Sequence, residues 1–169
     1  DIIETAECWQ IALDNATGPS VLVLTRQNLP TLRLDGSTEN KSARGAYVLH
    51  EAANATVNIW ASGSEVEIAI NAAEKLSAQN IAARVITVPS LELFLKQDAT
   101  YRASVAGSAK VNVAVEAAVR FGWDSVIGSD GVFIGMKSFG ESAPFEQLYE
   151  HFGITPDHIV KAVTAKLAG

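Results

Sequence analysis

"TVNIWASGSEVEIAINAAEKLSAQNIAARVITVPS", residues 56–90, is the stretch that decides the fold. Residues 56–62 carry Val, Ile and Trp in a short run of strand type, and a Gly-Ser turn follows it. Residues 65–79 repeat apolar side chains at the spacing of one helix face: Val66, Ile70, Ala73 and Leu76. Residues 82–90 return to a strand-like run that Pro89 stops. Strand, helix and strand in this order predict a βαβ unit with parallel strands and a right-handed crossover.

The same alternation continues on both sides of this stretch. Strand patterns also occur at 46–49, 110–117 and 131–140. Helical patterns occur at 91–98, 99–106, 145–152 and 156–167, the last with Pro156 in its first turn. The chain is therefore predicted to be an α/β protein with five strands in a mostly parallel sheet.

The N-terminal part of the chain follows a different pattern. Residues 5–14 have the spacing of a short amphipathic helix, and Ser20 to Thr25 read as a short, fully buried strand. From Asn28 to Arg44 the periodicity is lost in a polar stretch rich in Gly, Ser and Asn. We therefore expect three parts: the end of another α/β domain at 1–35, a linker at 36–45, and the main domain at 46–169.

Composition excludes several functions. A length of 169 residues with 48% hydrophobic residues suits one domain, or one domain plus a piece of another. The net charge of −6 argues against binding to nucleic acid or to an anionic membrane, and no apolar run approaches the ~20 residues of a membrane span. Cys8 is the only cysteine, so no internal disulfide can form, and a buried structural thiol is expected. The acidic start without an initiator Met indicates a fragment of a longer chain, with the cytoplasm as the default location.

Arg26 is the most suggestive candidate for chemistry. It follows the apolar run 20–25 and is flanked by Thr25, Gln27 and Asn28. Ligands of α/β proteins bind beyond the carboxyl ends of strands, and the arginine guanidinium matches phosphate oxygens. A surface arginine at the end of a strand is the commoner explanation, so the local sequence leaves both readings open.

Three further segments follow strands and are explained structurally. Ser62 to Glu67 resembles an anion-binding loop, but Ser62 or Ser64 as N-cap explains it, and its glutamates would repel a phosphate. Glu116 ends a strand without a nearby histidine or second acid, which favours a hydrogen-bonded structural carboxylate. Ser138 to Pro144 reads as a loop entering a helix, with Ser142 as N-cap and Pro144 in the first turn.

The histidines complete no active site. His50, His151 and His158 are far apart in the sequence and form no pair at the spacing of metal ligands. No cysteine or carboxylate cluster accompanies them, so surface or capping roles are expected. No complete catalytic constellation is present in the chain.

Several blocks of the chain nevertheless resemble the transketolase family. "GPSVLVLTRQNLP" (18–30) is similar to the end of the family's pyrimidine-binding domain, where an Arg-Gln-Asn-Leu-Pro segment follows the last strand. "ASGSEVEIAINAAEKL" (61–76) and "GMKSFGESAPFEQLYEHFGIT" (135–155) resemble its C-terminal domain, in order and at the expected spacing. The similarity covers essentially the whole chain.

The resemblance carries expectations of its own. It implies a three-layer α/β/α domain in which the first of five strands, at 46–49, is antiparallel, preceded by a helix-strand remnant of another α/β domain. Arg26 matches the arginine that binds the substrate's terminal phosphate. The family transfers two-carbon ketol units between sugar phosphates as a homodimer, using thiamine diphosphate and Mg²⁺ or Ca²⁺. The residues that bind this cofactor and metal lie upstream, so this segment is expected to bind neither and to be inactive alone.

Two alternatives remain at this point. One is a related thiamine enzyme, such as 1-deoxyxylulose-5-phosphate synthase or a 2-oxo-acid dehydrogenase subunit, although the Arg-Gln-Asn-Leu-Pro ending favours transketolase. The other is a stand-alone module for dimerisation or regulatory ligand binding. If residues 1–35 belong to a neighbouring domain, they should also be less ordered in solution than 46–168.

Overall fold

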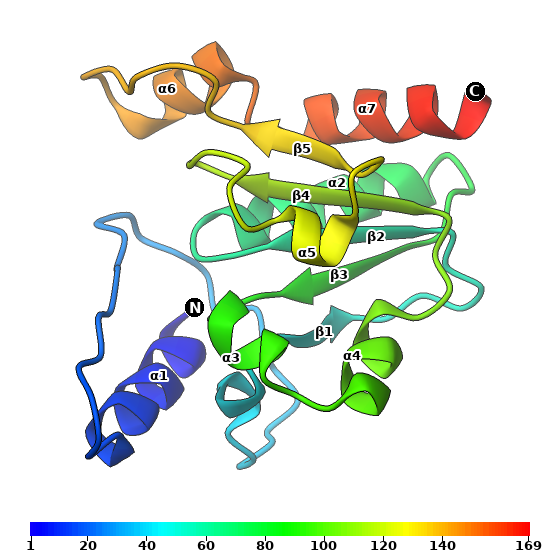
Figure 1. Cartoon of the computed structure of the whole chain (residues 1–169). Coiled ribbons are helices and arrows are strands. Elements are labelled where there is room, and N and C mark those ends of the chain that lie inside the picture. The colour runs from blue at the N-terminus through cyan, green and yellow to red at the C-terminus, as the bar shows by residue number, and fades with distance from the viewer.

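The protein is built on one five-stranded sheet (Figure 1). The computed structural model describes all residues from 1 to 169. The strands lie in the order β1-β3-β2-β4-β5; β1 is antiparallel to β3, and all other neighbours are parallel. Their bounds are β1 Tyr47–His50, β2 Val57–Ala61, β3 Ala83–Thr87, β4 Val111–Glu116 and β5 Val132–Gly135. The predicted sheet, including the antiparallel first strand, is confirmed.

Helices cover both faces of the sheet and make it a three-layer fold (Figure 1). Helices α2 (Glu65–Ser77) and α7 (Pro156–Ala168) pack on one face. The other face is covered by α3 (Leu91–Leu95), α4 (Ala99–Ala106) and α5 (Asp124–Ile127). Helix α6 (Phe145–Phe152) connects β5 to α7 and has no fully buried residue. None of these helices is long and apolar enough to cross a membrane.

Alternation along the central strand β2 separates two apolar cores. Ile59 belongs to the core under α2 and α7, whereas Trp60 belongs to the core under α3, α4 and α5. Both side chains are fully buried. Successive side chains of a strand point to opposite faces, so a strand covered on both sides must be apolar throughout. The continuous apolar runs in the sequence have this cause.

The predicted strand at Ser20 to Thr25 is wrong. These residues form no regular structure, and Val21 and Val23 are 86% and 92% exposed. A strand needs a neighbouring strand to satisfy its backbone N–H and C=O groups, and none of the five strands lies beside this segment. The apolar pattern is real, but this chain does not supply its partner.

Helix α1 (Ile2–Asp14) confirms the predicted N-terminal helix. It lies outside the sheet, beside a short 3-10 helix at Lys41–Arg44 (Figure 1). That 3-10 helix falls inside the expected linker 36–45. The division into 1–35, 36–45 and 46–169 stays a prediction.

Candidate functional site

Polar side chains gather at the carboxyl ends of β2 and β4. Ser62 follows β2, and its hydroxyl donates to Oε1 of Glu116, the last residue of β4, over 3.0 Å. The indole N–H of Trp123 donates to the other carboxylate oxygen over 2.7 Å. Each carboxylate oxygen of Glu116 therefore accepts a hydrogen bond, which agrees with the hydrogen-bonded carboxylate expected from the sequence.

Glu65 and Tyr149 form a second cluster beside the first. Glu65 opens α2 and is only 4% exposed. The phenol of Tyr149, on α6, donates to Glu65 Oε1 over 2.5 Å, and Ser64 donates to the same oxygen over 2.8 Å. Burial raises the pKa of Glu65, and the hydrogen bonds from Tyr149 and Ser64 oppose that rise. Burial raises the pKa of Tyr149 as well, so the phenol keeps its proton near neutral pH.

Ser64 does not cap α2 as its sequence position suggests. It occupies the N-cap position, but its side chain makes no capping hydrogen bond. Its hydroxyl instead bonds Glu65 and lies 2.9 Å from the phenol oxygen of Tyr149. The expected capping by Ser142 is also wrong, because α6 begins at Phe145 and Pro144 occupies its N-cap. Ser142 instead lines an open cleft.

Gln27 connects the N-terminal segment to this edge. Its side-chain amide donates to the phenol oxygen of Tyr149 over 3.2 Å, across 122 positions of the chain. This contact brings the loop that carries Arg26 against α6. Because Ser64 also lies 2.9 Å from the same phenol oxygen, the segment of Arg26 and the segment Ser62–Glu67 meet at Tyr149.

Arg26 lines an open cleft between these segments. One wall is formed by Thr25, Arg26 and Gln27, and the other by Glu141, Ser142, Ala143, Phe145 and Leu148. The cleft has a volume of about 730 Å³, which is the size of a small-molecule site. Arg26 is exposed and makes no ion pair or hydrogen bond in the chain. Its guanidinium is free to bind an anion that enters the cleft.

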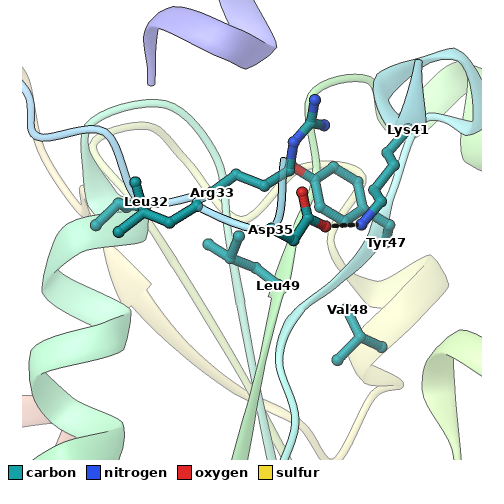
Figure 2. Close-up of a pocket in the computed structure, with 8 residues that line it drawn as sticks. Leu32, Arg33, Asp35, Lys41, Tyr47, Val48 and Leu49 are labelled. Carbon is teal, nitrogen blue, oxygen red and sulfur yellow. Dashed lines mark hydrogen bonds and ion pairs between the residues drawn. The ribbon is translucent and has the colours of Figure 1, made fainter. Parts of the chain in front are cut away.

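A second cavity differs because its charges are already paired. It measures about 230 Å³ and lies beside Arg33, Asp35, Lys41 and Tyr47 (Figure 2). Lys41 contacts Asp35 there, and Arg33 turns away to bond Glu7 of α1. With both cations neutralised, this cavity offers no free charge to a ligand.

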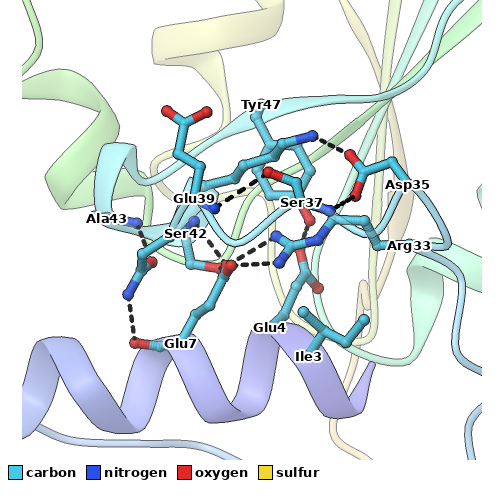
Figure 3. Close-up of polar contacts among 12 residues, drawn as sticks. Ile3, Glu4, Glu7, Arg33, Asp35, Ser37, Glu39, Ser42, Ala43 and Tyr47 are labelled. Atoms are coloured by element: carbon cyan, nitrogen blue, oxygen red, sulfur yellow. Dashed lines mark hydrogen bonds and ion pairs between the residues drawn. The ribbon is translucent and has the colours of Figure 1, made fainter.

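The contacts around Glu7 form a polar joint that holds α1 (Figure 3). Glu7 accepts hydrogen bonds from Arg33 and from the backbone and hydroxyl of Ser42. One turn earlier, Glu4 accepts from the hydroxyls of Tyr47 and Thr87. Sequence reasoning missed this joint, because its members lie on five separate segments and leave no local pattern.

The remaining candidates are structural. His158 Nδ1 lies 2.6 Å from the carbonyl oxygen of Gly153, and the ring of His151 packs edge-on against Phe152. Cys8 is half-buried, and burial raises the pKa of its thiol, which disfavours the reactive thiolate. No group of three or more His, Cys, Asp or Glu side chains in the structure could hold a metal ion.

Known proteins resemble this chain in sequence and in fold. A family model described as the transketolase-like TK C-terminal domain matches residues 45–155. The transketolase of Sinorhizobium medicae is 57% identical over 162 residues, which are 95% of this chain and 23% of that protein. The solved transketolase of Pichia stipitis in complex with sedoheptulose-7-phosphate is 32% identical at a TM-score of 0.90, covering 99% of this chain and 24% of that one.

A further structural match is a split-gene transketolase, described as an inactive beta4 tetramer. It is 29% identical at a TM-score of 0.62 and covers 75% of this chain and 43% of that one. The chain spans about a quarter of the length of the curated relatives that it matches. With the matching family model and the five-stranded sheet, these likenesses assign the chain to the transketolase family, of which it carries the C-terminal domain.

Proposed function

We propose that the chain is the C-terminal part of a transketolase. The whole enzyme would be a thiamine-diphosphate-dependent transferase that moves a two-carbon ketol unit between ketose and aldose phosphates in the pentose phosphate pathway. Membership of the family supports this proposal, and the curated relatives that match nearly the whole chain carry the name transketolase. This favours transketolase over a related thiamine enzyme.

Arg26 is proposed to bind the terminal phosphate of the sugar substrates. The observation that carries this role is its free, exposed guanidinium at the wall of a cleft of about 730 Å³. An arginine fork can donate two charge-assisted hydrogen bonds to one phosphate. Thr25 and Ser142 supply hydroxyl groups, one on each wall. Glu141 is exposed on the opposite wall, where water and salt weaken its repulsion of a phosphate.

Such a contact would act by binding and not by bond making. The phosphate of a sugar lies several bonds away from its reacting carbonyl. Binding energy from this remote group holds the carbonyl in place for the reaction. Arg26 is therefore proposed as a substrate-binding residue, and no catalytic residue is assigned on this chain.

The residues present do not fit the cofactor or its metal. Mg²⁺ and Ca²⁺ need several oxygen ligands, and the structure holds no suitable cluster. The buried acid Glu65 and the half-buried Glu116 are already engaged by hydroxyl and indole donors. Thiamine diphosphate and Mg²⁺ or Ca²⁺ are accordingly proposed for the upstream part of the enzyme.

The upstream domains and a second subunit are the proposed partners. Trp9 and Leu13 of α1 and Val21 and Val23 of the following segment are exposed, and folded proteins seldom leave such a group uncovered. An upstream domain could cover them, and the family's homodimer would form the complete sites in the cytoplasm. The inactive split-gene tetramer among the similar structures supports the view that this part alone does not catalyse.

The substitution Arg26→Gln in the full-length enzyme tests the role of Arg26. We expect the KM for phosphorylated donors to rise about 10- to 100-fold, since hydrogen bonds to charged groups contribute roughly 1.5–3 kcal/mol. The KM for an unphosphorylated ketol donor should not change. Arg120→Gln is the control, because Arg120 is paired with Asp124 away from the cleft. Equal KM changes for the two donors would refute the proposed role.

A further inference from the structure

We infer that Tyr149 is a positioning residue, whose phenol holds Gln27 and thereby fixes the loop that presents Arg26 to the substrate phosphate. This inference rests on the proposed phosphate-binding role of Arg26. It gives the C-terminal domain a part in substrate selection, although that domain contributes no atom to the chemical step.

The hydrogen bonds around Tyr149 run in one direction. The Gln27 amide donates to the phenol oxygen over 3.2 Å, and the phenol donates its own proton to Glu65 over 2.5 Å. A phenol has one proton to give, so donation to Glu65 leaves its oxygen as an acceptor for Gln27. The Glu65 carboxylate, at the end of this series of hydrogen bonds, polarises the phenol and makes its oxygen a stronger hydrogen-bond acceptor.

Glu65, which anchors this series of hydrogen bonds, is held rigidly. Glu65 is the first residue of α2, which packs on β2 and β3 in the centre of the fold, and its side chain is buried. Ser64 donates to the same Glu65 oxygen over 2.8 Å and fixes its position further. The ring of Tyr149 also packs edge-on against Phe145, with 5.9 Å between the ring centres. The phenol oxygen is therefore held at a defined point of the domain.

The Arg26 loop has little else to hold it. Residues 17–39 make no backbone–backbone hydrogen bonds. The bond from Gln27 to Tyr149 is the only hydrogen bond between residues 16–31 and residues 46–169. Arg26 is the neighbour of Gln27 in the chain, so fixing one side chain restricts where the other can reach. Removing the phenol hydroxyl would release the loop without changing the charge of the cleft.

The test is Tyr149→Phe in the full-length enzyme, which removes the hydroxyl and keeps the ring. We expect the KM for a phosphorylated ketose to rise roughly 2- to 12-fold, the range for one net hydrogen bond. The kcat, and the KM for an unphosphorylated ketol donor, should stay within about twofold. Gln27→Leu should give the same split, and the double variant should be no worse than either single one. Amide exchange of residues 25–28 should quicken in Tyr149→Phe.

Tyr101→Phe is the matched control. The Tyr101 phenol donates to the carbonyl oxygen of Ala46 over 2.8 Å, on the opposite face of the sheet from α2. The inference is overturned if Tyr149→Phe changes the KM for phosphorylated and unphosphorylated donors equally, or if Tyr101→Phe has the same effect as Tyr149→Phe. It is also overturned if the KM effects of Gln27→Leu and Tyr149→Phe are additive in the double variant. If Arg26→Gln raises the KM for the phosphorylated donor and Tyr149→Phe does not, only the positioning role of Tyr149 is refuted. If Arg26→Gln also has no effect, the proposed phosphate site falls with it.

Discussion

Arg33 and Glu7 form a two-point ion pair inside the joint between α1 and the rest of the chain. Arg33 Nη1 donates to Glu7 Oε2 over 2.9 Å, and Nη2 contacts the other carboxylate oxygen (Figure 3). Both side chains are buried. The Glu7 bond raises the pKa of Arg33, so the pair stays charged at any ordinary pH. The docking of α1 thus depends on a desolvated charge pair that is costly to break.

Replacing Arg33 should release α1. Arg33→Met leaves the buried Glu7 carboxylate without its cation, which costs about 3–5 kcal/mol when such a pair is broken. Amide exchange of α1, measured by mass spectrometry, should accelerate accordingly. Lys41→Met is the control, since it breaks the more exposed Lys41–Asp35 pair and should cost less than about 1 kcal/mol. If Arg33→Met and Lys41→Met accelerated the amide exchange of α1 equally, the Arg33–Glu7 pair would not be what holds the helix.

The same pair predicts a loss of stability in acid. Burial raises the pKa of Glu7, but the hydrogen bonds from Arg33 and Ser42 outweigh it and lower the pKa to about 2, from an ordinary value of 4.5. The folded pKa is below the unfolded one, so the stabilisation is fully present above about pH 4.5. It is lost as the pH falls toward 2 and amounts to about 3 kcal/mol. Denaturant titrations across this range should show the loss, and Glu7→Gln should flatten it.

Gly45 should tolerate no side chain. Its φ is +82°, and an added Cβ would lie 2.2 Å from the backbone nitrogen of Phe94. Gly45→Ala is therefore expected to destabilise the domain by about 3 kcal/mol or more, because backbone atoms cannot move aside cheaply. Gly63→Ala is a matched control with φ +52° and nothing within 4 Å, so only the strain of about 1 kcal/mol remains. Thermal unfolding of both variants gives the comparison, and similar losses would argue against the close approach at Gly45.

Backbone protection should divide the N-terminal part in two. Residues 17–39 lack backbone–backbone hydrogen bonds, so their amides should exchange faster than those of α1, apart from Leu32 and Arg33, whose amides donate to Asp1. Helix α1 should be protected, but less than the sheet strands, because the polar joint alone ties it down. Hydrogen exchange resolved by residue measures this order. Uniform protection from residue 1 to residue 168 would be inconsistent with it.

The isolated 169 residues should neither bind thiamine diphosphate nor transfer a ketol unit. The structure holds no cluster of metal ligands to anchor a diphosphate. Calorimetric titration of thiamine diphosphate with Mg²⁺ should give no saturable heat, and an assay with a ketose phosphate donor should give no turnover. The full-length enzyme, under the same conditions, is the positive control. Measurable turnover by the segment would overturn its assignment as a dependent part.

Most of the fold could be predicted because its signals are local. Both faces of β2 are buried, so its sequence is a run of mainly apolar residues. The buried residues Val66, Ala69 and Ala73 of α2 recur at the spacing of one helix face. The sequence did not predict helix α5, because a helix of four residues is too short to show a repeating apolar spacing. The false strand at 20–25 has the opposite cause: its pattern is local, but its partner strand is not in this chain.

The candidate site was predicted only in part. Arg26 has a recognisable type and place after an apolar run, so the sequence could nominate it. The bond from Gln27 to Tyr149 joins residues 122 positions apart, and no spacing rule reports such a meeting. The Glu7–Arg33 pair is hidden for the same reason, since charges on separate segments look like ordinary surface residues. Both contacts depend on the tertiary structure, which brings together residues that are distant in the sequence.

The carboxylate of Asp1 has a consequence for the reach of Arg26. Its Oδ2 accepts hydrogen bonds from the backbone of Leu32 and Arg33, over 2.8 and 3.0 Å. Residues 1–33 therefore form a non-covalent ring that is pinned where its ends meet. Within a closed ring, the length of the free stretch sets how far its middle extends. Inserting one or two residues between Gly18 and Thr25 is expected to lengthen this stretch while leaving α1 docked. The position of the guanidinium thus depends on the length of this stretch as well as on the bond from Gln27 to Tyr149.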